Sequence, residues 1–120
     1  MTKEALSSNK KVYDLEERTA LFGESVIEFA KTLSKNPITT PIISQFIRAG
    51  TSIGANYMEA DAAGTKKDFK YKISLCRKEA KETGHWLRMI AKALPDKKDE
   101  ARSIWKECRE LVFIFSSILK

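Results

Sequence analysis

Few side chains in this sequence could perform acid–base, nucleophilic or metal chemistry, and their spacing matches no known catalytic pattern. His85 is the single histidine, and with Cys76 and Cys108 it forms neither a Cys-x-x-Cys nor a His-x-x-x-His spacing. The order of residues also contains no nucleophile elbow and no Ser–His–Asp arrangement. Di-iron bundles need two Glu-x-x-His motifs, and only one, from Glu82 to His85, is present. We therefore expect no metal, no cofactor and no enzymatic activity.

Three glutamates remain that could act together. Glu79 and Glu82 are three residues apart, so they share one face of a helix, and Glu59 could approach them from a neighbouring helix. Such a group could hold a metal, or it could form salt bridges with Arg48 or Lys72. Because the histidine ligands of a bundle metal site are missing, the sequence favours the salt bridges.

The strongest indication of binding is a one-sided row of cations on the third predicted helix. At 100° per residue, six basic side chains fall within an arc of about 80°, and no acidic residue shares that arc. We call these six the basic stripe: Lys66, Lys70, Arg77, Lys81, Arg88 and Lys92. Residues 65–94 carry a net charge of +6, which equals the net charge of the whole chain. Solvated faces usually mix both signs of charge, so the stripe indicates an anionic partner such as RNA. The alternative is a solvated face that only keeps the protein soluble.

The second and third predicted helices each carry another row of side chains that points away from the predicted core. The row on the third helix combines apolar and acidic residues, and exposed apolar residues that cluster indicate an interaction surface. Two such rows in one small bundle favour contacts between subunits over two solvated faces. Phe113 and Ile114, outside the core arc of the last helix, also indicate a partner surface. The predicted subunit-interface residues are Arg48, Ser52, Asn56, Glu59, Leu75, Glu79, Glu82 and Trp86.

Capping signals divide the chain into four helices that must position these rows. Asp14 is a predicted N-cap for the first helix. Thr40 is predicted to cap the second helix, with Pro41 as its first residue. Thr65 is predicted to cap the third, and Pro95 ends it before the fourth begins.

The predicted fold is all-α. Apolar residues repeat every three or four positions in each helical segment, and short links join antiparallel neighbours. We therefore expect an antiparallel, up-down-up-down four-helix bundle that forms one domain over residues 13–120, preceded by a flexible N-terminal arm over residues 1–12. Gly50 and Gly54 lower helix propensity in the second helix, which is typical of close packing against a neighbouring helix.

Composition sets the class of protein. The chain has 120 residues, of which 42% are hydrophobic and 32% charged, so it is neither collagen-like nor largely disordered. The apolar run at residues 111–115 is far shorter than the roughly 20 residues of a membrane helix, and no signal peptide opens the sequence. We expect a cytoplasmic protein without a membrane partner, whose two cysteines are buried thiols rather than a disulfide.

Four stretches of the chain resemble one known family. They are YDLEERT at residues 13–19, NPIT at residues 36–39, QFIRAGTSIGANYMEA at residues 45–60 and KEAKETGHWL at residues 78–87. The sequence resembles the 23S rRNA intervening-sequence proteins, bacterial four-helix bundles often labelled ribosomal-protein-like. Gly50 and Met58 depart from the Ala and Arg that the resemblance leads us to expect.

The resemblance implies a homopentameric ring of four-helix bundles. A related branch, the accessory proteins of diversity-generating retroelements, forms a basic pentameric barrel that binds nucleic acid and a reverse transcriptase. The resemblance implies no catalytic activity. The family's motif positions coincide with most of the predicted subunit-interface residues, namely Arg48, Ser52, Asn56, Glu59, Glu79, Glu82 and Trp86.

Two functions from different classes follow. The first is a non-enzymatic oligomeric scaffold that binds RNA or another nucleic acid through the basic stripe. The alternative is a protein–protein interaction module, for example a reverse-transcriptase accessory protein, with no direct role in nucleic-acid binding. Because the arc of the stripe holds no aromatic residue, we expect recognition of the phosphate backbone rather than of bases.

Overall fold

The computed structural model describes residues 14–120, so the arm predicted over residues 1–12 lies outside the described residues. The described chain forms four α-helices and one short 3-10 turn, and it contains no strand. The elements are α2 (Leu15–Lys31), α3 (Thr39–Asp61), α4 (Lys66–Ala93), η2 (Pro95–Lys97) and α5 (Lys98–Leu119). The all-α prediction is confirmed.

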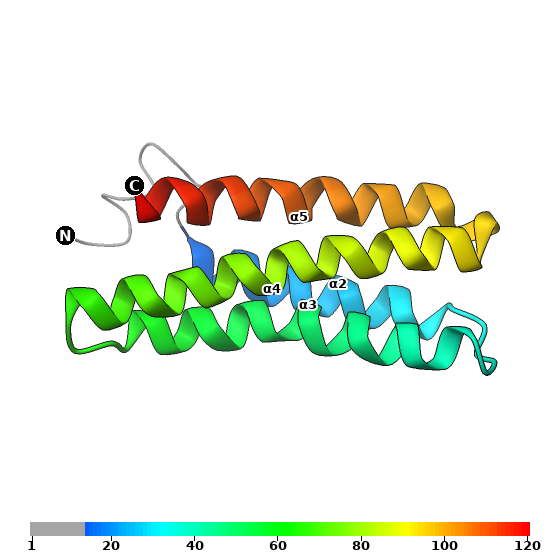
Figure 1. The fold of residues 1–120 in the computed structure, drawn as a ribbon, viewed down its shortest axis with the longest axis horizontal. Helices are drawn as coiled ribbons and strands as arrows, with labels where there is room; N and C mark the ends of the chain where they lie inside the picture. The colour runs from blue at the N-terminus through cyan, green and yellow to red at the C-terminus, as the bar shows by residue number, and fades with distance from the viewer. Residues whose placement is uncertain (1–13) are drawn as a thin grey trace.

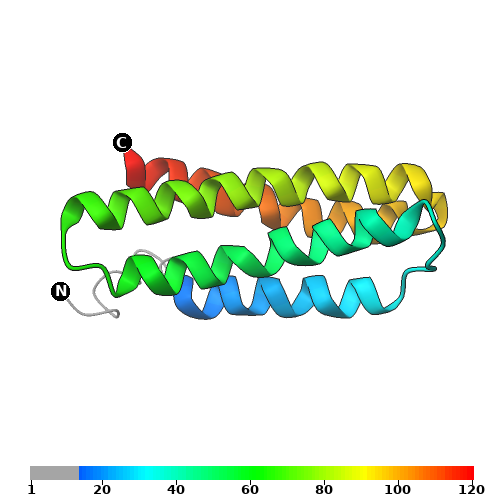
Figure 2. The same cartoon turned by 60° about the horizontal axis from the view of Figure 1, so that its bottom comes forward.

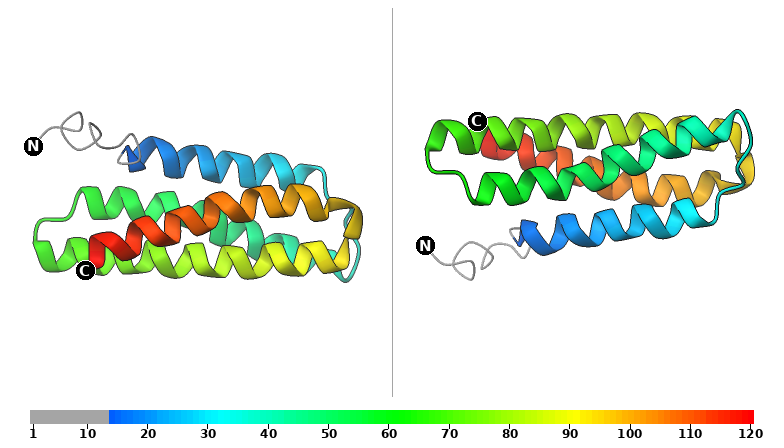
Figure 3. Two further views of the ribbon diagram at one scale, coloured as in Figure 1. Left: turned by 90° about the horizontal axis from the view of Figure 1, so that it is seen from above. Right: turned by 90° about the horizontal axis from the view of Figure 1, so that it is seen from below.

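The helices form an elongated antiparallel bundle of about 47 × 25 × 22 Å. Successive helices run in opposite directions, and α5 lies along α4 (Figure 1). On its other side α4 packs against α3, which in turn packs against α2 (Figure 2). Contacts between α2 and α5 are far fewer. Seen from above, α2 lies along one edge of the bundle and α5 runs obliquely in front, between α2 and α4 (Figure 3). The long helix α4 therefore has two extensive partners, α3 and α5.

Local capping explains where two of the helices begin. The Asp14 side chain accepts a hydrogen bond from the backbone N–H of Glu17 at 3.3 Å, and the Thr65 hydroxyl accepts one from Asp68 at 3.0 Å. Each bond satisfies an N–H group that has no partner within the helix. Both predicted caps are confirmed, and α4 ends before Pro95 as expected.

The start of α3 differs from the prediction. Thr40 is not the N-cap, because the helix already begins at Thr39. The side-chain oxygen of Asn36 accepts hydrogen bonds from Ile38 N–H at 2.8 Å and from Thr39 N–H at 2.9 Å, which stabilises an earlier first turn. Pro41 still lies within that first turn, where its missing N–H costs no hydrogen bond.

The predicted core rows meet along the bundle axis. The largest fully buried apolar side chains come from all four helices: Val26, Phe46, Ile53, Ile73, Leu87, Ile90, Leu111 and Phe115. Close packing of α2 and α3 depends on Gly50, since a Cβ there would lie 2.7 Å from Cγ2 of Val26. The packing interpretation of Gly50 is therefore confirmed.

The two cysteines are buried free thiols, as predicted. The Cys108 thiol donates to the carbonyl of Ala80 at 2.8 Å, and the Cys76 thiol donates to the carbonyl of Ile53 at 3.6 Å. Each thiol thus has its own backbone acceptor on a neighbouring helix. No helix within residues 14–120 combines the length and the apolar character that crossing a membrane requires.

Candidate nucleic-acid interface

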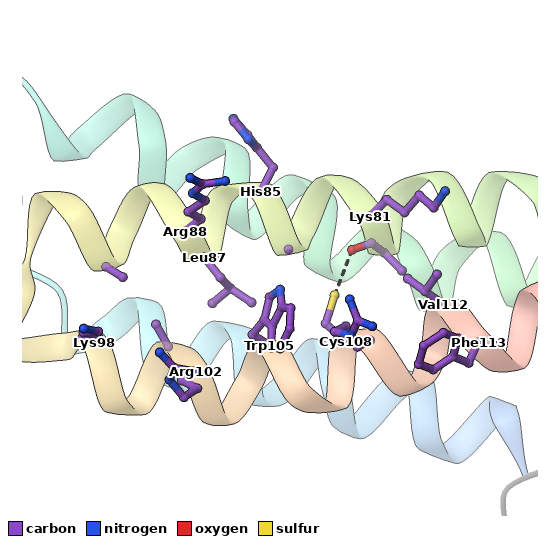
Figure 4. A pocket seen from close by; sticks show the side chains of 15 residues that line it. Lys81, His85, Leu87, Arg88, Lys98, Arg102, Trp105, Cys108, Val112 and Phe113 are labelled. Atoms are coloured by element: carbon purple, nitrogen blue, oxygen red, sulfur yellow. Dashed lines mark hydrogen bonds between the residues drawn. The ribbon is translucent and has the colours of Figure 1, made fainter.

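The basic stripe lies on the side of α4 that faces α5. Lys81 and Arg88 line a groove between the two helices (Figure 4). Arg77 is half-buried, and its guanidinium donates to the Ser116 hydroxyl of α5 at 3.3 Å. The other three stripe residues lie along the same helix, Lys66 and Lys92 exposed and Lys70 half-buried. The stripe therefore continues beyond the groove at both ends of α4.

The groove between α4 and α5 encloses about 720 Å³, and none of its fifteen lining residues is acidic. We call it the α4–α5 groove. Its cations are Lys81, Arg88, Lys98, Arg102 and Arg109. Its small and apolar residues are Ala80, Gly84, Leu87, Ala91, Ala101, Cys108 and Val112, and His85, Trp105 and Phe113 complete the lining. Cationic side chains thus surround an apolar surface.

Sequence reasoning missed the contribution of α5 to this surface. Lys98, Arg102 and Arg109 come from α5 and lie beside the stripe of α4. The repeat of basic and aromatic residues at positions 98, 102, 105, 109 and 113 was a usable signal, because steps of three and four share one helix face. Only the pairing of α4 with α5 places that repeat next to the basic stripe.

The arc of α4 holds no aromatic residue, as predicted, but α5 brings Trp105 and Phe113 into the groove beside it. Trp105 is 37% exposed and Phe113 is 56% exposed. The Arg109 guanidinium lies 5.0 Å from the ring centre of Trp105 and 5.2 Å from that of Phe113. These rings belong to α5, so the arc of α4 alone could not reveal them. The apolar neighbour Ile114 is half-buried against the core, so Phe113 is the more exposed of that pair.

The predicted subunit-interface rows lie side by side within one chain, between α3 and α4. Arg48 forms ion pairs with both Glu79, at 3.2 Å, and Glu82. The indole N–H of Trp86 donates to Glu82 at 3.1 Å. The salt-bridge interpretation of these carboxylates is confirmed.

The remaining members of the rows lie beside that cluster. Lys72 pairs with Glu59 at 2.5 Å, the second salt bridge that the sequence favoured. Asn56 donates to the carbonyl of Ser52 at 2.9 Å, and Leu75 is half-buried. A role of these residues in subunit contacts stays a prediction.

Electrostatics favours the charged forms of Arg48 and Glu82. The hydrogen bond from Trp86 and the contact with Arg48 lower the pKa of the Glu82 carboxyl. The same contact raises the pKa of the Arg48 guanidinium. One arginine therefore serves two carboxylates, of which the Glu79 side chain is only 11% exposed.

Within residues 14–120, no three His, Cys, Asp or Glu side chains are grouped so that they could hold a metal ion. His85 is exposed at the edge of the α4–α5 groove. Its ring lies edge-on to Trp86, with centres 4.8 Å apart. The histidine thus belongs to the groove surface rather than to the core.

Comparison with known proteins identifies a family and a solved structure with a similar fold. The family model described as 23S rRNA-intervening sequence protein matches residues 3–117. No curated protein matches the chain. A crystal structure of a protein of unknown function from the S23 ribosomal protein family of Bacteroides thetaiotaomicron VPI-5482 is similar, with a TM-score of 0.80 and 30% sequence identity. The match covers 88% of this chain and 97% of that one.

Proposed function

This chain belongs to the 23S rRNA-intervening sequence protein family, and from that premise we propose that it is a non-enzymatic, oligomeric scaffold of the cytoplasm that binds RNA through its basic face. The observation that carries the proposal is the α4–α5 groove, whose five cations come from two helices while no lining residue is acidic. A surface of one charge sign attracts a polyanion and raises its association rate. The family's description refers to 23S rRNA, which agrees with an RNA partner, but it identifies no RNA that this chain binds.

The stripe and the groove together suit a phosphate backbone. With six phosphate contacts, the logarithm of the RNA-binding constant K would fall as the logarithm of the salt concentration rises. The slope would be roughly −4 for single strands and −5 for duplexes. In a homopentamer the surface would be repeated five times, so modest contacts would add up if one RNA spans several subunits. This arrangement would make oligomerisation part of the binding mechanism.

Binding of fluorescently labelled RNA at two salt concentrations tests the proposal. The wild type is expected to bind at about 50 mM salt and to release RNA as salt rises. Reversal of Lys81 and Arg88 to Glu should abolish binding, because both side chains line the groove. Reversal of Lys31 and Lys35 to Glu changes the net charge equally at exposed sites on the α2 side and should preserve binding. RNA binding that survives the groove reversal would contradict the proposal and favour the protein–protein interaction module.

Sedimentation equilibrium tests the oligomeric part. A homo-oligomer, with five copies as the expected number, should sediment well above the 13.6 kDa of one chain. A monomer at micromolar concentration would contradict the scaffold proposal.

A further inference from the structure

We infer that the α4–α5 groove is a base-stacking site for single-stranded nucleic acid, in which Trp105 and Phe113 stack on bases while the surrounding cations contact phosphates. The inference rests on the proposed function and deepens it, because it names the part of the nucleic acid that is read. It replaces recognition of the backbone alone with recognition of exposed base faces.

The two rings are placed for different bases. Trp105 and Phe113 are eight residues apart on α5, about 12 Å along a helix that rises 1.5 Å per residue. Arg109 lies between them with its guanidinium near both ring centres. A planar guanidinium also stacks on bases. Because Arg109 already lies over both rings, a base would stack on the part of each ring that stays exposed beside it.

The partly exposed rings of Trp105 and Phe113 lie together in one groove, and clustered exposed apolar side chains indicate an interaction surface. Trp105 packs close to Gly84, because a Cβ added at Gly84 would lie 3.6 Å from the indole. The Trp105 side chain nevertheless remains 37% exposed. Bases of a duplex are stacked on one another and cannot use such a ring. Unpaired bases can be splayed onto aromatic side chains, which is how single strands are bound with little sequence preference.

The charge around the rings favours a polyanion over a second copy of this chain. A second groove, between α2 and α3, has Glu16, Glu17 and Glu24 in its lining and could in principle face the α4–α5 groove of another copy. Three carboxylates would leave part of the five groove cations and the rest of the basic stripe unmatched. A nucleic-acid strand supplies one phosphate per nucleotide along the whole surface.

Matched single-stranded and duplex oligonucleotides test the inference. We would titrate a fluorescein-labelled RNA of about 12 nucleotides, within the range that single-strand-binding modules cover. Trp105→Leu and Phe113→Leu should each weaken its binding by about 5-fold or more, the loss of one stacked base. Both variants should bind the duplex as the wild type does. Because no charge is removed, the salt slope should be unchanged. A DNA strand of the same sequence should behave like the RNA, since stacking does not require the 2′-hydroxyl.

Tyr71→Leu is the matched control. Tyr71 is 59% exposed, close to the 56% of Phe113, and lies on α4 outside the groove. Its replacement should leave single-strand binding unchanged. An equal loss in this variant, or no loss in either ring variant, would overturn the inference.

Tryptophan fluorescence of the wild type gives a second readout that needs no variant. Single-stranded RNA should quench the wild type through Trp105. In the control variant Trp105→Leu the remaining emission comes from Trp86, which is half-buried, hydrogen-bonded to Glu82 and outside the groove lining, and should not respond. Emission that stays constant while the wild type binds the strand would overturn the inference.

The outcomes also separate this inference from the proposed function. If the wild type binds neither strand nor duplex, both fail. If the Lys81 and Arg88 reversals abolish binding while the ring variants bind normally, only the stacking site fails. If Trp105→Leu lowers the oligomeric mass and leaves RNA affinity unchanged, the groove is a contact between copies, and the stacking site is again overturned.

Discussion

Arg18 of α2 and Glu107 of α5 form a two-bonded ion pair between two helices that otherwise share few contacts. Nε to Oε2 is 2.7 Å and Nη2 to Oε1 is 2.9 Å. The hydrogen bond with Glu107 raises the pKa of the Arg18 guanidinium. Since α2 otherwise packs mainly on α3, this pair connects the first described helix to the last.

Removal of that pair should destabilise the bundle modestly. Arg18→Ala is expected to lower the free energy of unfolding by about 1 kcal/mol, because a two-bonded guanidinium–carboxylate pair lies at the upper end of surface pairs. Urea denaturation of the wild type and of Arg18→Ala measures this change in the free energy of unfolding. Lys31→Ala removes a far more exposed pair with Glu28 and should change stability by less than about 0.5 kcal/mol. An equal loss of unfolding free energy in the two variants would show that the Arg18–Glu107 pair stabilises the bundle no more than an exposed surface pair does.

Close packing of α2 on α3 predicts an unfavourable Gly50→Ala substitution. Alanine gains about 1 kcal/mol of helix propensity, but its Cβ would be 2.7 Å from Val26, so we expect a net loss of about 1–2 kcal/mol. Val26→Ala in the same chain should recover part of the loss. Thermal melting with Gly64→Ala as control checks this, because a Cβ at Gly64 meets nothing within 4 Å. A more stable Gly50→Ala protein would refute the packing account.

The Arg48 cluster predicts a coupled effect on stability and assembly. Arg48→Ala leaves the carboxylate of Glu79, 11% exposed, without its ion-pair partner, so the free energy of unfolding should fall by about 2 kcal/mol. If the predicted interface rows meet another subunit, Arg48→Ala and Glu59→Ala should also reduce the oligomer in sedimentation equilibrium. Lys106→Ala, at an exposed position of α5, is the control. Unchanged assembly in both row variants would remove these residues from the interface.

Stability should decline at high pH because of the two cysteines. Burial raises the pKa of the Cys76 and Cys108 thiols to about 12, from an ordinary value of 9.0. The folded protein therefore keeps both protons while the unfolded chain releases them, so this contribution is complete below about pH 9 and is lost progressively toward pH 12. Urea midpoints across this range measure the slope. The variant with both cysteines changed to Ala should lose this decline of stability with pH. An equally steep decline in that variant would assign the effect to other titrating groups.

The sequence by itself determined the elements and their buried faces. Helix caps at Asp14 and Thr65, the break before Pro95 and the core spacing are local properties, since they depend on residues within about a turn of each other. The basic stripe is equally local, because one helix carries all six cations. The family resemblance was confirmed for the same reason: its motifs are contiguous runs.

Only the tertiary structure decided which faces meet. Arg48 pairs with Glu79 and Glu82 because α3 and α4 present their second rows to each other, whereas either row alone also fits a contact between subunits. Trp105 and Arg109 lie beside the basic stripe because α5 packs on that side of α4. Periodicity shows which side chains share a helix face, but the rotation and neighbour of each helix follow from packing of the whole core. The groove is therefore a property of the fold that no single helix reveals.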